Sequence, residues 1–107
     1  VTTLEQTLVD TLHRPMSCGG PAVVFEAWES AAEILSQENM TTLLRQIGDP
    51  RLLRRAGYML GRLGFDRKVL EELEILAPQT IEHEPAVSLL PGIPFSTLDP
   101  RWRVLVP

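Results

Sequence analysis

This chain of 107 residues lacks most features that would point to a specialised environment. It has one cysteine, so no intramolecular disulfide can form. No apolar run approaches the ~20 residues of a membrane-spanning helix, and neither a charged leader nor a hydrophobic signal segment is evident. We therefore expect a single globular domain in a reducing cytoplasm, with no membrane partner.

Sequence motifs that bind nucleotides or catalytic metals are also missing. There is no G-x-x-x-x-G-K-[ST], no G-x-G-x-x-G and no H-E-x-x-H. His83 stands between Glu82 and Glu84, but one histidine between two acids has too few ligands for a zinc site. The sequence predicts no metal, no cofactor and no catalytic residues, and hence no enzymatic activity.

Cys18 is the one residue that suggests a nucleophile. It comes just before a predicted helix, a position that can activate a thiol. Nucleophilic catalysis also needs a base that is held in place by a third group. His13 ends the preceding helix without an evident partner of that kind. We expect Cys18 to be a small turn residue, with a reactive thiol as the alternative.

Apolar residues at helical spacing predict about five short helices in residues 1–77. Thr3 with Gln6, or Thr2 with Glu5, fits a capping box at the start of the first helix. Its apolar face consists of Leu4, Leu8, Val9 and Leu12, which leaves Glu5, Thr7 and Asp10 on the exposed side.

Proline and glycine place the boundaries of the next two helices. Pro15 stops the first helix, and Gly20 followed by Pro21 begins a second that runs to about Gln37. Asn39 is the expected cap of a short third helix. Its end is predicted at Gly48.

The fourth and fifth helices begin at Asp49 and Asp66, each a capping residue. The fourth ends at Gly64 and the fifth before Pro78. Small side chains in the fourth helix would let another helix approach closely; they are Ala56, Gly57 and Gly61.

The last 30 residues differ from the rest, since six of the nine prolines lie between Pro78 and Pro107. Residues 86–90 and 101–106 are strand candidates, and the second could pair with the extended residues 1–3. The predicted fold is α+β and mostly helical. Residues 1–107 form a single domain, divided into a helical part (1–77) and an extended proline-rich arm (78–107).

The net charge of −4 conceals a basic cluster. Residues 45–68 contain seven basic and two acidic side chains, which gives +5 there and −9 elsewhere. The candidate contact residues of the fourth helix are Arg51, Arg54, Arg55 and Arg62, at spacings that place several on one face. Three interpretations remain open: internal pairing with the acidic helices, contact with a protein partner, and contact with nucleic acid. A pI near 5.1 weakens the last.

Three stretches resemble one family. They are LEQTLVDTLHRPMSCGGPAVVFEAW (4–28), GDPRLLRRAGYMLGRLG (48–64) and LDPRWRVLV (98–106). In this order they are similar to the C-terminal domain of AbiEi-type antitoxins, from bacterial abortive-infection systems of type IV. The matching positions that we expect to be structural are Glu5, Asp10, Arg14, Pro15, Gly19, Gly20, Arg55, Gly57, Tyr58 and Trp102.

The resemblance implies a transcriptional regulator whose N-terminal winged-helix domain binds operator DNA and is missing here. The start at Val1 rather than methionine agrees with a fragment of a longer protein. The C-terminal domain would counteract a toxin of nucleotidyltransferase type, usually without forming a stable complex. This sequence departs from the family at Gln6, where arginine is frequent, and in its proline-rich tail. An auxiliary DNA-contacting or protein-interaction domain that uses helix 50–63 is the alternative function.

Overall fold

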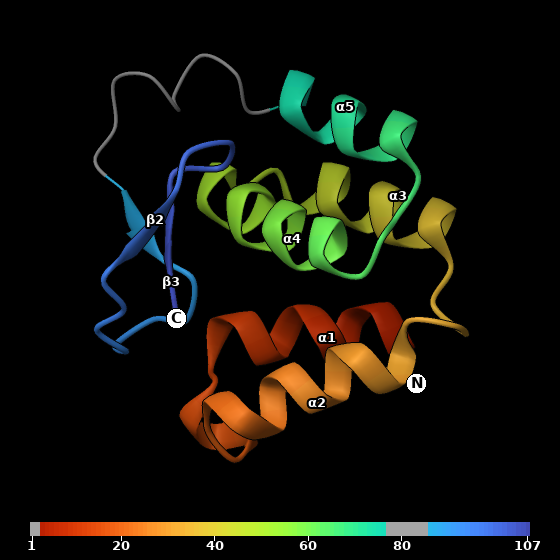
Figure 1. Ribbon diagram of the computed structural model, residues 1–107. Coiled ribbons are helices and arrows are strands. Elements are labelled where there is room, and N and C mark those ends of the chain that lie inside the picture. Colours follow the sequence, from red (N-terminus) through yellow and green to blue (C-terminus); the bar gives the residue numbers. More distant parts are fainter. Residues whose placement is uncertain (1–2, 77–85) are drawn as a thin grey trace.

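The computed structural model describes residues 3–76 and 86–107. In this part the chain forms five α-helices and a small three-stranded sheet (Figure 1). The predicted class, α+β and mostly helical, is confirmed. His83 and the first part of the expected arm, residues 78–85, lie outside the described residues. In the described ranges no helix is both long and apolar enough to cross a membrane.

Helix α1 (Leu4–His13) begins where the capping pattern predicts. The Thr3 hydroxyl accepts a hydrogen bond from the backbone N–H of Gln6 at 3.1 Å. Thr3, and not Thr2, is therefore the cap. Glu5 differs from the expected exposed position, because it is buried at 7% exposure where the first turn of α1 meets α3.

The turn after α1 contains a short 3₁₀ helix, η1 (Met16–Cys18). Gly19 and Gly20 follow with φ of +108° and +90°, values that L side chains rarely adopt. Helix α2 (Pro21–Ala31) then begins with Gly20 as the cap and proline at its first position, as predicted. It lies beside α1 (Figure 1).

Two predicted boundaries around α3 (Gln37–Ile47) are wrong. The second helix ends at Ala31 and not near Gln37, because the chain turns there and places Leu35 in the core. Ser36, and not Asn39, caps α3: its hydroxyl accepts the N–H of Asn39 at 3.2 Å. Asn39 lies inside the helix.

Helices α4 (Pro50–Arg62) and α5 (Arg67–Leu76) agree closely with the prediction. Asp49 caps α4 through the N–H of Arg51 at 3.0 Å, and Asp66 accepts the N–H of Lys68 at 2.9 Å. Helices α1 and α4 are central: α1 contacts α2, α3 and α4, while α4 also packs against α5 and the sheet (Figure 1). The largest fully buried side chains include Trp28, Trp102, Arg54, Leu8, Leu12, Met40, Leu44, Leu52, Met59 and Leu60.

The sheet contains β1 (Val87–Ser88), β2 (Thr97–Asp99) and β3 (Val104–Val106) in the order β1-β3-β2. The β3 strand pairs parallel with β1 and antiparallel with β2. Both edges of β3 are thus occupied, so the expected pairing with residues 1–3 is corrected: Thr3 caps α1, and Val1 and Thr2 lie outside the described residues. From residue 86 the expected arm contributes Leu89, Leu90, Trp102, Val104 and Val106 to the core, with Trp102 only 2% exposed.

The Trp102 indole lies directly on the backbone of α4 at Gly57. A Cβ atom added to Gly57 would be 2.6 Å from Cη2 and Cζ3 of the ring. The small residues of α4 were expected to admit another helix. At Gly57 the group that approaches is an aromatic side chain, whereas at Gly61 the nearest atom is Leu70 Cδ1 of α5, at 3.8 Å.

We expect Gly57→Ala to lower the free energy of unfolding by about 1–3 kcal/mol, because the indole must move away from the added methyl group. Gly61→Ala is the matched control in the same helix. It adds helix propensity without a clash and should raise stability by up to about 1 kcal/mol. Urea denaturation of both variants measures the difference, and equal effects would contradict the close contact at Gly57.

Candidate functional site

Arg54 was a candidate contact residue, but the structure buries it completely, at 0% exposure. Its Nε donates to the carbonyl oxygen of Trp102 at 2.9 Å, and its Nη2 donates to that of Arg103 at 2.6 Å. The guanidinium thus holds the turn that carries the indole onto Gly57. Arg54 cannot meet a protein or DNA partner while the domain is folded, so its assignment as a surface contact is corrected.

Arg55 is half-buried and also has a backbone partner. Its Nε donates to the carbonyl oxygen of Ser88 in β1 at 2.8 Å. Burial lowers the pKa of the Arg55 guanidinium from its ordinary value; the neighbouring Asp49 opposes this effect, and Arg51 and Arg54 add to it. Arg54 and Arg55 together attach the C-terminal sheet to α4.

Arg62 and Arg51 are the two candidates that remain exposed. Arg62 Nη2 lies 3.5 Å from Glu29 Oε1 of α2, and its guanidinium is 4.7 Å from the centroid of the Phe25 ring. The side chain of Arg51 has no partner among the described residues. The four arginines therefore do not form one surface.

Other members of the basic cluster pair with acidic helices, as one of the three interpretations predicted. Arg45 pairs with Glu72 of α5, and Arg67 with Glu71 one turn later at 3.1 Å. These pairs are solvent-exposed, so each contributes little to stability. They nonetheless neutralise much of the charge that the sequence concentrates in residues 45–68.

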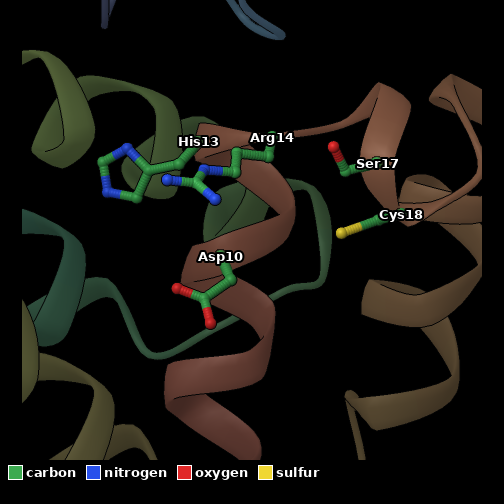
Figure 2. A pocket seen from close by; sticks show the side chains of 5 residues that line it. All are labelled: Asp10, His13, Arg14, Ser17 and Cys18. Atoms are coloured by element: carbon green, nitrogen blue, oxygen red, sulfur yellow. The ribbon is translucent and has the colours of Figure 1, made fainter.

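An open hollow of about 640 Å³ lies where α1 meets the turn with η1. Figure 2 shows Asp10 and His13 of α1 and Arg14 directly after it, with Ser17 and Cys18 across from them. The imidazole of His13 is directed away from the Cys18 thiol, and no hydrogen bond joins the two side chains. The thiol thus has no base positioned to activate it. In the described ranges no group of three or more His, Cys, Asp or Glu side chains could hold a metal ion.

The other positions of the resemblance lie at the turn, in α1 and on α4. Pro15 is buried, whereas Arg14 and Asp10 are exposed. Asp10 accepts a hydrogen bond from Gln6 Nε2 at 3.1 Å, one helical turn away. Tyr58 is half-buried and lines a small hollow between α4, α5 and the turn before β3.

Two structural contacts were missed by sequence reasoning. Trp28 Nε1 donates to the Thr11 hydroxyl at 2.9 Å and ties α2 to α1. Arg103 has a left-handed φ of +49°, and its carbonyl oxygen accepts from both Arg54 and β1. The sequence held one indication that Arg54 faces the core. Arg54 precedes Gly57 by three residues, so both lie on the same face of α4.

Arg54→Met is expected to lower the free energy of unfolding by about 2–4 kcal/mol, because buried carbonyl groups lose a charged donor. Arg54→Lys should recover part of this loss, since an ammonium group is a donor without the planar fork. Arg51→Met, in the same helix but exposed, should change stability by less than about 0.5 kcal/mol. Thermal and urea unfolding measure all three, and a mild effect at Arg54 would exclude its anchoring role.

No family model, no curated protein and no solved structure matches this chain. What the domain does is therefore inferred from its own residues and their geometry.

Proposed function

We propose that this chain is a non-enzymatic antitoxin domain of a bacterial transcriptional regulator, counteracting a toxin of nucleotidyltransferase type. The observation that carries the proposal is how the three family-like stretches lie in the fold. The stretch 4–28 forms α1, the turn and α2; 48–64 forms α4; and 98–106 contains β3. Helix α4 contacts both α1 and β3, so the three stretches are parts of one core.

The second and third stretches contact each other directly in the fold. Gly57, from the second, supplies the bare backbone on which Trp102, from the third, lies. Arg55 of the second also donates to Ser88, beside β3. Residues that depend on one another in this way are expected to occur together, which supports a resemblance that includes both of these stretches.

Binding or regulation is favoured over chemistry at Cys18 by the geometry of the α1 hollow. The thiol faces Asp10 and Arg14 across open space, while His13 points elsewhere (Figure 2). In a regulator of this family, operator DNA would be bound by an N-terminal winged-helix domain, and a cytoplasmic location belongs to the same proposal. Neutralisation of the toxin would not require a stable complex.

The alternative, direct DNA contact through α4, has lost much of its support. Arg54 and Arg55 have backbone partners, and Arg62 has both an acidic and an aromatic partner. Arg51 alone of the four has no partner among the described residues. One exposed arginine supplies little of the phosphate neutralisation that nucleic-acid binding requires.

The proposal predicts a gene for a nucleotidyltransferase-type toxin beside the gene of this chain, and co-expression with that toxin tests it. We expect the chain to restore growth of bacteria that produce this toxin. Cys18→Ser should restore growth equally well, because the thiol has no part in a binding function. Gly61→Ala should also rescue, and Gly57→Ala should rescue less in proportion to its lower stability.

Two outcomes of the co-expression experiment would count against the antitoxin proposal. Failure of the folded, soluble wild-type chain to rescue growth would reject the antitoxin function. Loss of rescue by a stable Cys18→Ser variant would point instead to chemistry at the thiol.

A further inference from the structure

Arg103 has a backbone conformation that suits glycine. Its φ of +49° is the only positive value at a residue other than glycine in the ranges 3–76 and 86–107. Side chains rarely adopt this conformation, because the Cβ atom comes close to the following carbonyl oxygen. The carbonyl oxygen of Arg103 accepts hydrogen bonds from Arg54 Nη2 at 2.6 Å and from the N–H of Val87 at 3.2 Å. Both bonds use the main chain, so glycine at this position would preserve them.

The side chain of Arg103 adds a second cost to stability. Its Nε atom is buried and has no hydrogen-bond partner within the described part of the chain. A buried donor without a partner is destabilising, and more so when the group is charged. The two Nη nitrogens make no hydrogen bond or ion pair there either, and this end of the half-buried side chain reaches solvent. The fold therefore explains the backbone of Arg103 but not its charged side chain.

Two leucines lie near this guanidinium on the outer face of the sheet. Val104 and Val106 of β3 are buried, whereas Leu105 between them is half-buried, so Leu105 faces away from the core. Leu98 of β2 is paired directly with Leu105 and is 44% exposed, and directly paired residues share a face. Arg103 also lies between two buried residues and precedes Leu105 by one strand repeat. We call Arg103, Leu98 and Leu105 the outer sheet surface.

We infer that the outer sheet surface contacts an acidic site on the toxin, and that Arg103 donates its Nη hydrogens to a carboxylate there. This inference rests on the proposed function. A planar guanidinium can bind a carboxylate through two parallel hydrogen bonds. The leucine side chains beside it exclude water from the pair, as the surroundings of energetically important interface arginines do. The contact can be brief, in agreement with neutralisation that needs no stable complex.

Two other occupants of the outer sheet surface fit less well. Nucleic acid binding requires several cations that can meet phosphates, but Arg101 in the same turn pairs with Glu74 and Arg54 is buried. A stable dimer needs roughly 800 Å² from each copy, far more than two leucines and one arginine provide. A brief contact with one acidic site requires only a small surface.

Substitution of Arg103 should change stability and rescue of growth in opposite directions. We expect Arg103→Gly to raise the Tm of the chain by about 2–6 °C, because the backbone strain and the unpartnered Nε are both removed. Rescue of toxin-producing cells by this variant should fall at least about tenfold in surviving colonies, because the contact loses its charged donor. Arg103→Asn, which also tolerates a positive φ, should behave like the glycine variant. Arg51→Met removes an exposed arginine elsewhere and is the matched control, with full rescue expected.

The outcomes separate this inference from the proposed function. No rescue by the wild-type chain would reject the antitoxin function and the inference with it, whereas full rescue by both wild type and Arg103→Gly would reject the inference alone. A lower Tm of both Arg103 variants would show that the side chain serves the fold, and would also overturn it. So would a wild-type dimer that Arg103→Gly dissociates in sedimentation velocity, which assigns a second copy, or Arg103-dependent DNA binding in a low-salt gel shift.

Discussion

The contact of the Trp102 indole with the bare backbone at Gly57 is the constraint on which the C-terminal half of the fold depends. The three strands contain only two or three residues each, too few to form a stable sheet alone. Trp102 supplies the sheet with a large buried surface against α4, and Arg54 donates to two consecutive carbonyl oxygens, those of Trp102 and Arg103. A side chain at position 57 would occupy the space that the ring requires. Helix α4 therefore provides both the space for the Trp102 ring, at Gly57, and the hydrogen-bond donor for its turn, Arg54.

Burial of Arg54 changes how the charge of the chain should be interpreted. A guanidinium removed from water needs several good acceptors, and two carbonyl oxygens of the turn before β3 are among them. Its charge is thus part of the attachment of the sheet and not of the surface. Arg55 has a similar role at Ser88. The +5 of residues 45–68, counted from the sequence, overstates the positive surface that the folded domain offers.

The sequence was sufficient for features that depend on a few neighbouring residues. Gly20 with Pro21 and Asp49 with Pro50 define helix starts by local hydrogen bonding and φ values, and both were predicted correctly. Thr3 is one of the two caps that the sequence offered for the first helix. The choice of Ser36 over Asn39 depended on the burial of Leu35, a tertiary effect. The partners of Arg54 lie 48 and 49 residues away, so its spacing from Gly57 alone was not enough to predict its burial. The predicted pairing of residues 101–106 with residues 1–3 was wrong for the same reason, because strand partners are set by tertiary contacts and not by neighbouring residues.

A side chain whose polar atoms are already bonded inside the domain cannot bind a ligand without loss of stability. By this criterion Arg54 and Arg55, which donate to backbone carbonyl groups, stabilise the fold and are not available to bind a ligand. Gly57 and Trp102, from two of the family-like stretches, likewise have their partners within the core. A partner of the folded domain can therefore contact only the side chains that this packing leaves exposed.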